Sequence, residues 1–117
     1  VGAPPVARFL AAGVRLAVGT DSLASAPDLN LFGELQAMRG LAPEAPARRL
    51  LAAATQGGAE ALGLDAELGT IAPGKRAALI AVTLPTGTAD PEEALVGGIG
   101  PAAVRVLEVA DDGEGRN

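Results

Sequence analysis

The chain has 117 residues, of which 49% are hydrophobic and 20% are charged, and it contains neither cysteine nor histidine. This composition is typical of one soluble globular domain, and the lack of cysteine excludes disulfide bonds and thiolate metal sites. The net charge of −5 argues against a nucleic-acid-binding surface and against binding to an anionic membrane.

The first predicted element is a helix over residues 4–13. Two prolines suit its first turn, and the glycine at residue 13 suits its end. Val6, Phe9 and Leu10 have the spacing of one apolar helix face. We therefore expect this face to pack against the rest of the chain.

The next predicted element is a buried strand from Arg15 to Thr20, because this run is short and apolar and directly follows the helix stop. Side chains alternate between the two faces of a strand. Leu16 and Val18 therefore share one face, and the smaller residues share the other face with Asp21. We expect the larger side chains to point at surrounding helices.

A loop rich in Ser, Pro, Asp and Asn is predicted from Ser22 to Asn30. The next helix runs from Leu31 to about Arg39, and Gly40 is expected to end it. Asp28 or Ser25 has the side chain needed to cap its first turn. Leu31, Leu35 and Met38 form its apolar stripe, with Phe32 beside them.

Two further helices are predicted over residues 43–54 and 56–62. Thr55 is the expected cap of the second, and Gly63 is expected to end it. The pair Gly57–Gly58 weakens that helix by about 1 kcal/mol per glycine relative to alanine. The pair is not a phosphate-binding loop, and we interpret it as a turn or linker.

The pattern becomes rich in predicted strands after Leu64. The acidic residues Asp90, Glu92 and Glu93 are interpreted as a surface cluster that does not hold a metal. The predicted elements are a short strand at 69–71, a strand at 77–84, a loop at 85–91, a last strand at 101–109 and a disordered tail at 111–117.

Asp21 is the candidate catalytic residue, because it stands at the carboxyl end of the predicted strand, where parallel α/β barrels place their active sites. A carboxylate there can bind a divalent metal or accept a proton from water. On spacing alone, a turn or a helix cap is the favoured interpretation of Asp21. Ser22 is a candidate substrate contact, although ordering of the loop is its favoured role. A serine hydrolase is excluded because the chain has no histidine base.

Four blocks of the sequence resemble, in their order and approximate spacing, the end of metal-dependent amidohydrolases of the deaminase and chlorohydrolase branch. The blocks are GVRLAVGTDS at 13–22, LNLFGEL at 29–35, ATQGGAEALG at 54–63 and LGTIAPGK at 68–75.

The resemblance implies an α/β fold in which a (β/α)8 TIM-type barrel carries the site and a small β-sandwich is made from both chain ends. Residues 1–64 would be the last barrel strand with its flanking helices, and residues 65–110 part of the β-sandwich, followed by the tail at 111–117. Asp21 would correspond to the aspartate after the eighth strand, which contacts the metal and activates the hydrolytic water. The metal would be zinc first, with iron as the alternative.

The sequence lacks the histidines that the family uses as metal ligands. A catalytic zinc site has three protein ligands, and Asp21 supplies one. We therefore expect a fragment of a hydrolase acting on C–N bonds of a nucleobase-like small molecule, either a deaminase or a related chlorohydrolase, and inactive alone. The alternative is a stand-alone α+β module that acts as a non-catalytic scaffold by association.

The sequence also bears on location and partners. No run approaches the roughly 18 apolar residues of a membrane span, and the first residues lack the pattern of a signal peptide. We therefore expect a cytoplasmic protein that binds a small-molecule substrate in its parent form and neither nucleic acid nor membrane. A homo-oligomer is left open.

Overall fold

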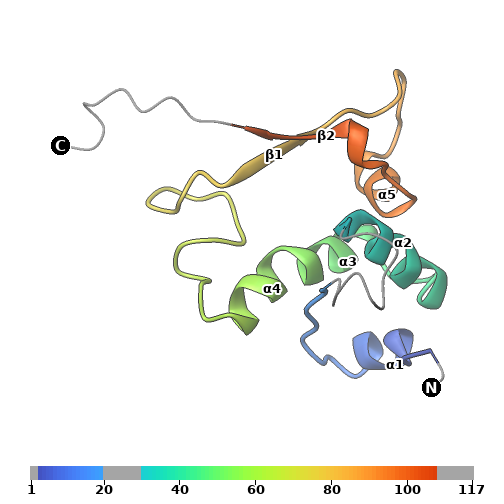
Figure 1. Cartoon of the computed structure of the whole chain (residues 1–117). Helices are drawn as coiled ribbons and strands as arrows, with labels where there is room; N and C mark the ends of the chain where they lie inside the picture. Colours follow the sequence, from blue (N-terminus) through green and yellow to red (C-terminus); the bar gives the residue numbers. More distant parts are fainter. Residues whose placement is uncertain (1–2, 20–29, 108–117) are drawn as a thin grey trace, which may run out of the picture.

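A computed structural model describes residues 3–19 and 30–107. Within these residues, helices gather at one side, and a two-stranded sheet extends away from them (Figure 1). The elements are α1 (Val6–Ala11), α2 (Leu31–Leu41), α3 (Ala47–Ala54), α4 (Gln56–Ala61), β1 (Leu79–Val82), α5 (Pro91–Val96), a 3-10 turn η1 (Pro101–Ala103) and β2 (Val104–Leu107).

The core lies where α2, α3 and α5 pack against one another. Each helix contributes one side chain that is almost completely excluded from solvent: Leu35 (2% exposed), Leu50 (0%) and Val96 (0%). Val6 and Leu10 of α1 extend the same cluster. The apolar faces predicted for the first two helices therefore do form a core, although α5 completes it.

Helix α1 confirms the first predicted helix. Its chain reverses at Gly13, where φ is +77°, a backbone conformation that glycine adopts without strain. The N–H of Val14 donates to the carbonyl of Phe9 there, which gives an orphan helix carbonyl a partner. Phe9 itself is 39% exposed, so the prediction that it belongs to the buried face of this helix was wrong.

Helix α2 is capped by Asn30, whose Oδ1 accepts a hydrogen bond from the N–H of Phe32 at 3.1 Å. The two residues expected to cap it, Ser25 and Asp28, lie outside the described residues. The predicted stop at Gly40 was wrong, since the helix continues to Leu41.

Helix α3 begins at Ala47, later than predicted, because Ala45 precedes Pro46 and a residue before proline avoids the helical conformation. A single residue, Thr55, separates α3 from helix α4. The Oγ1 of Thr55 donates to the carbonyl of Leu51 at 2.9 Å, back along α3, so its side chain does not cap α4 as predicted.

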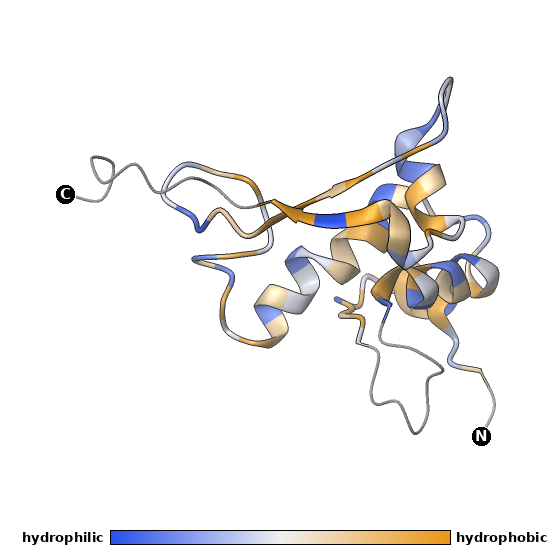
Figure 2. Cartoon of the chain, turned by 45° about the horizontal axis from the view of Figure 1, so that its top comes forward, coloured by the Kyte–Doolittle hydropathy of each residue, from blue (hydrophilic) through white to orange (hydrophobic). Residues whose placement is uncertain are grey.

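The region after α4 has fewer strand residues than the sequence predicted. No strand is found at 69–71; the loop there is closed by Lys75, whose Nζ donates to the carbonyl of Asp65 at 2.6 Å and to Oγ1 of Thr70 at 2.7 Å. Strands β1 and β2 pair antiparallel, with Ile80 opposite Val106. Hydrophobic residues dominate both strands, interrupted in β2 by Arg105, and the ribbon of the sheet is mostly orange (Figure 2).

Helix α5 begins at the last residue of the predicted loop, continues through residues for which no element was predicted, and was missed. Pro91 occupies its first turn, and the side chain of Asp90 accepts a hydrogen bond from the N–H of Glu93 at 3.1 Å. Both are typical helix-start features. The acidic residues Asp90, Glu92 and Glu93 are exposed, as predicted, and they also start a helix, which was not predicted.

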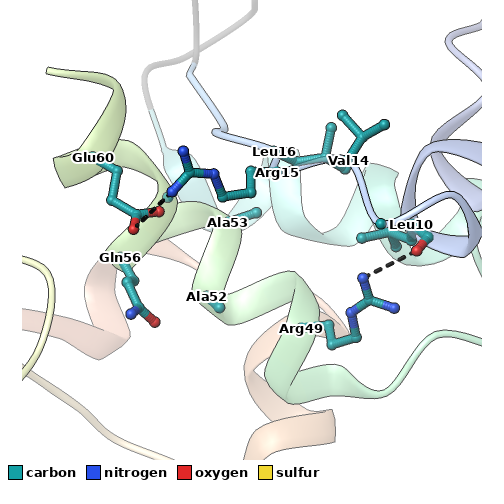
Figure 3. Close-up of a pocket in the computed structure, with 11 residues that line it drawn as sticks. Leu10, Val14, Arg15, Leu16, Arg49, Ala52, Ala53, Gln56 and Glu60 are labelled. Carbon is teal, nitrogen blue, oxygen red and sulfur yellow. Dashed lines mark hydrogen bonds and ion pairs between the residues drawn. The ribbon is translucent and has the colours of Figure 1, made fainter.

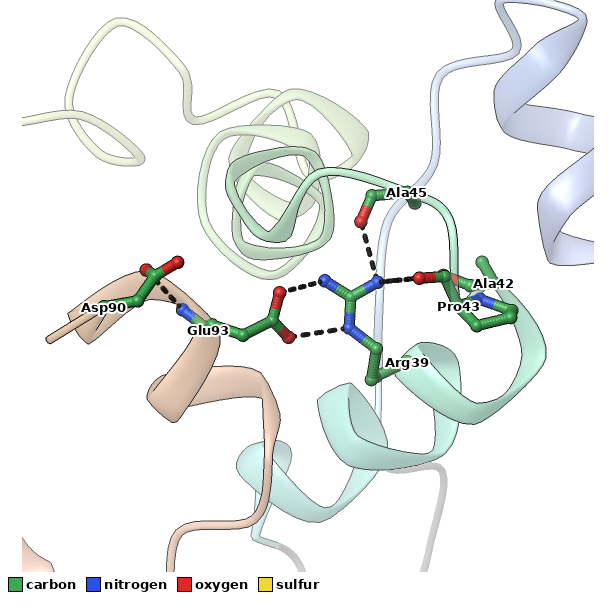
Figure 4. A network of polar contacts seen from close by, with 6 residues as sticks. All are labelled: Arg39, Ala42, Pro43, Ala45, Asp90 and Glu93. Atoms are coloured by element: carbon green, nitrogen blue, oxygen red, sulfur yellow. Dashed lines mark hydrogen bonds and ion pairs between the residues drawn. The ribbon is translucent and has the colours of Figure 1, made fainter. Parts of the chain in front are cut away.

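One arginine joins α5 to the helices of the core (Figure 4). Arg39 of α2 forms two hydrogen bonds to the carboxylate of Glu93, at 2.8 and 2.9 Å. Its Nη1 also donates to the carbonyls of Ala42 and Ala45 at 3.0 and 2.7 Å. The Arg39 side chain is 17% exposed. Its hydrogen bonds connect the end of α2, the turn before α3 and the start of α5.

Among the residues that the structure describes, no helix has the length and apolar character needed to cross a bilayer.

Candidate functional site

The segment that leads to Asp21 is irregular over residues 14–19 and not a strand. A barrel strand is held by hydrogen bonds to neighbouring strands, and the described residues place no strand beside this one. The predicted buried strand is therefore wrong for this chain. The predicted alternation holds: Leu16 and Val18 are half-buried against the helical core, and the residues between and around them are exposed.

The segment is fixed to the helices by a backbone hydrogen bond. The N–H of Val18 donates to the carbonyl of Ala53, near the end of α3, at 3.1 Å. Gly19 is the last described residue before the candidate site. Asp21 and Ser22, the predicted catalytic and substrate-contact residues, lie outside the described residues.

Helix α4 touches the same segment at Gly57. A Cβ added at Gly57 would overlap the carbonyl oxygen of Leu16, whereas one added at Gly58 would meet nothing within 4 Å. Both glycines lie inside α4, so the turn or linker interpretation was wrong. Gly57 allows the segment and the helix backbone to approach closely, which offsets its weak helix propensity.

A small cavity of about 190 Å³ lies between α1, this segment and α3–α4 (Figure 3). At one side, Nη2 of Arg49 donates to the carbonyl of Leu10 at 3.1 Å. At the other, Nη1 of Arg15 pairs with the carboxylate of Glu60 at 3.4 Å. Both guanidinium groups already have protein partners. We therefore interpret the cavity as a gap between packed elements, and the contacts of Arg15 and Arg49 at its sides join these elements.

A larger hollow of about 560 Å³ lies between the end of the segment, α4 and residues 64–80. Aliphatic side chains dominate its lining, and some are strongly exposed, such as Leu62 (74%) and Ile80 (51%). Thr55, Thr70 and Arg76 add polar groups. Binding sites orient a ligand with a few convergent polar groups, and this groove offers mainly apolar surface.

The described residues contain no group of three potential ligands that could hold a metal ion. The whole chain has no histidine and no cysteine. A catalytic zinc needs three protein ligands, so the residues present do not fit a metal by themselves. Asp21 is the one carboxylate predicted from the sequence to be a metal ligand.

Asn30, at the far end of the predicted loop, was given no role by the sequence argument. Besides capping α2, its Nδ2 donates to the carbonyl of Ile99 at 2.8 Å. The side chain therefore joins positions that are 69 residues apart. The preference for asparagine at helix caps could have identified the first of these roles, but no local signal identifies the second.

A profile of the amidohydrolase family matches residues 1–110. Among similar curated proteins are the 5-methylthioadenosine/S-adenosylhomocysteine deaminases of Desulforudis audaxviator (44% identical over 86 residues, 68% of this chain and 20% of the relative) and Moorella thermoacetica (41% over 90 residues, 71% and 21%). The 5'-deoxyadenosine deaminase of Methanothermobacter thermautotrophicus is 43% identical over 86 residues, which cover 68% of this chain and 20% of the relative. The chain thus spans about a fifth of the length of these relatives.

A solved structure, an adenosine deaminase from Xanthomonas campestris with bound zinc, resembles the chain with a TM-score of 0.79 and 34% sequence identity. The likeness covers 91% of this chain and 27% of the other. Together with the profile match, it confirms the predicted α/β class of the barrel type.

Proposed function

Because the chain belongs to the amidohydrolase family, we propose that it forms the C-terminal part of a metal-dependent hydrolase that releases ammonia from an adenosine-like small molecule. The observation that carries this proposal is the likeness of 91% of the chain to a zinc-bound adenosine deaminase. The similar curated proteins are named as deaminases of 5'-modified adenosines. Their names favour a deaminase over a chlorohydrolase and a nucleoside over a free base.

The proposal assigns residues 1–64 to the end of the barrel and residues 65–110 to the small β domain. The change after α4 from helices to a run of turns and then strand β1 supports a boundary near Leu64. Helix α5 belongs to the second part by sequence, yet it packs on α2 and α3. It therefore anchors the second part to the first.

We assign Asp21 as a metal ligand and as the carboxylate that accepts a proton from the attacking water, and Ser22 as a contact to substrate. A bound divalent metal, zinc first and iron as the alternative, would lower the pKa of water and polarise the substrate. In support, the chain is anchored just before Asp21: Leu16 and Val18 pack on the helices, and Val18 is bonded to Ala53.

The 117 residues alone are proposed to be inactive. Asp21 provides one ligand where a catalytic zinc requires three, and the chain has no histidine or cysteine to add. The remaining ligands would come from other parts of the parent protein. The match covers 20% of the relative, so most of a protein of that length is available to supply them.

A chimera tests the proposal. Residues 1–117 replace the matching fifth of the Desulforudis audaxviator deaminase, and ammonia release from 5-methylthioadenosine is measured together with zinc content. We expect the chimera to bind zinc and turn over substrate, and the 117 residues alone to do neither. Asp21→Asn should lower kcat by about 10²- to 10⁴-fold, the range for loss of a proton-transfer group.

Asp65→Asn is the matched control, since Asp65 is an exposed turn residue; it should leave kcat unchanged. Full activity of a zinc-loaded Asp21→Asn chimera would refute the assigned role of Asp21. Zinc-dependent turnover by the isolated 117 residues would refute their inactivity. A folded chimera without turnover would instead favour a non-catalytic scaffold.

A further inference from the structure

The hollow of about 560 Å³ between α4, residues 64–76 and β1, which we call the apolar groove, is lined mainly by aliphatic side chains. Leu62, Ile71 and Ile80 come from its three sides and are 74%, 87% and 51% exposed. Val106, 74% exposed, lies opposite Ile80 and therefore on the same face of the sheet. Exposed apolar side chains that gather in this way mark a surface for packing against protein.

One wall of the groove is a loop that Lys75 closes. Its Nζ donates to the carbonyl of Asp65 at 2.6 Å and to Oγ1 of Thr70 at 2.7 Å. Next to it, the N–H of Arg76 donates across the loop to the carbonyl of Glu67 at 2.9 Å. These bonds join the two ends of the loop and give it a defined shape, although it contains no helix or strand.

The same loop lies against α4 at Gly69. A Cβ added at Gly69 would lie 2.8 Å from Cβ of Ala59 and 3.1 Å from Cα of Gln56, and φ is +100°. A larger residue is therefore disfavoured at this position. Together, Lys75 and Gly69 fix the place of Ile71 before any partner binds. A surface ordered in advance loses less conformational freedom on binding than a mobile one.

The likeness to longer proteins indicates what covers the groove. The zinc-bound adenosine deaminase resembles 91% of this chain, yet the match is 27% of that longer chain. The described elements are therefore arranged as in a protein in which about three quarters of the residues lie outside the match. A second copy of the chain is a less suitable occupant, because each copy carries a net charge of −5 and like charges oppose association.

We propose that the apolar groove is the surface on which apolar side chains from the rest of the parent protein pack, and that Lys75 keeps its loop wall in the shape that they require. This inference rests on the proposed function, in which the 117 residues are one part of a longer enzyme. Ile71 is then exposed in the 117 residues and buried in the whole protein.

Cysteine labelling in the 117-residue chain and in the chimera described above tests the surface. The chain has no cysteine of its own, so a maleimide reports on the one position that carries a new thiol. Ile71→Cys should react about 100-fold more slowly in the chimera, the protection expected for a packed site. Thr86→Cys, in an exposed turn, is the matched control and should react equally fast in both proteins. Ala53→Cys, at a side chain that is 4% exposed, sets the slow limit in both.

The outcomes separate this inference from the proposed function. Equal rates for Ile71→Cys in both proteins, with Ala53→Cys slow in both, would overturn the inference and leave the test of turnover unaffected. Slow labelling of Ile71→Cys in the 117-residue chain that speeds up on dilution would identify a second copy as the occupant and would also overturn it. Protection of Ile71→Cys in a folded chimera without turnover would support the surface and contradict the proposed function.

Lys75→Met tests the loop wall in the 117-residue chain itself. Methionine keeps the aliphatic stem and removes every donor. Exchange of the backbone amide of Arg76 should become about 10-fold faster, the effect of losing hydrogen bonds from a charged group. Arg8→Met, at an exposed position of α1, is the matched control and should leave this exchange unchanged.

The same substitution links the loop to the surface. In the chimera, Lys75→Met should speed the labelling of Ile71→Cys by at least about fivefold, toward the rate in the 117-residue chain. Arg8→Met should not change it. Unchanged amide exchange at Arg76, or unchanged labelling of Ile71→Cys in the chimera, would overturn the role of Lys75.

Discussion

The helices α2, α3 and α5 enclose a core, whereas strands β1 and β2 leave hydrophobic side chains in contact with solvent. Leu35, Leu50 and Val96 are at most 2% exposed, while Ile80 and Val106, opposite each other in the sheet, are 51% and 74% exposed. Among the described residues between α4 and α5, and after Val96, none is buried.

This difference follows from how the two kinds of element satisfy their backbone groups. A helix forms its hydrogen bonds within itself and needs only an apolar face on a neighbour. A strand needs other strands for its hydrogen bonds and another layer for its face, and two strands alone are marginal. The chain therefore contains enough partners for its helices and too few for its strands.

The largest expected effect tests whether the helical core carries the stability of the chain. Leu50→Ala should destabilise it by about 2–5 kcal/mol, as is typical for truncation of a fully buried leucine. Ile71→Ala, at a side chain that is 87% exposed, should stay within about 0.5 kcal/mol. Urea unfolding followed by circular dichroism at 222 nm measures both. Equal losses would mean that the second region is packed after all.

The next effect concerns the fastening of α5 to the core. Arg39→Lys should cost about 1.5–3 kcal/mol, because lysine keeps the charge but not the planar fork that bonds Glu93 and the carbonyls. Arg48→Lys is the matched control: its pair with Glu92 spans 3.9 Å between side chains that are 78% and 52% exposed. The control should cost less than about 1 kcal/mol. Equal thermal shifts for the two variants would refute the fastening role.

Two adjacent glycines should give changes of opposite sign. Gly57→Ala should destabilise the chain by about 1–3 kcal/mol, because its Cβ would overlap the Leu16 carbonyl. Gly58→Ala meets nothing within 4 Å and should stabilise α4 by about 0.5–1 kcal/mol. Differential scanning calorimetry on both variants decides this, and stabilisation by Gly57→Ala would show that the segment before Asp21 does not lie against α4.

The smallest effect on stability is expected in the sheet, with a larger effect on association. Ile80→Lys combined with Val106→Glu places opposite charges across the two strands. The free energy of unfolding should change by less than about 1 kcal/mol, while concentration-dependent self-association should fall, since an exposed apolar edge strand promotes it. Sedimentation velocity at several concentrations measures this. Val106→Ile, which keeps the apolar surface, should associate like the parent; equal association of all three would contradict the idea.

The helices near the N-terminus could be predicted because their signals are local. Proline at the start, glycine at the end and an apolar spacing gave α1, and the stripe through Leu35 and Met38 gave α2. Helix α5 was missed because its apolar residues, Ala94, Leu95 and Val96, are adjacent in the sequence and lack the i, i+3, i+4 spacing that identified α1. The sequence Asp90-Pro91 with glutamate at 93 is, however, a recognisable helix start.

The errors around the candidate site lie where a residue depends on partners far along the chain. Arg15 to Thr20 reads as a strand, but a strand pattern without neighbours does not form a sheet. Gly57 was interpreted only as a residue that weakens its helix, because no local signal shows that the Leu16 carbonyl lies against it. The assignments of Asp21 and Ser22 remain predictions, since both residues lie outside the part of the chain that the structure describes.

The burial of Val96 against α2 and α3 has a consequence for biosynthesis. A ribosome makes the two earlier helices well before it reaches this valine, and contacts between distant positions form late. Until α5 emerges, the apolar surfaces around Leu35 and Leu50 lack one of their covering helices. During that interval this apolar surface of the nascent chain stays partly uncovered, and a premature stop before Pro91 would leave it so permanently.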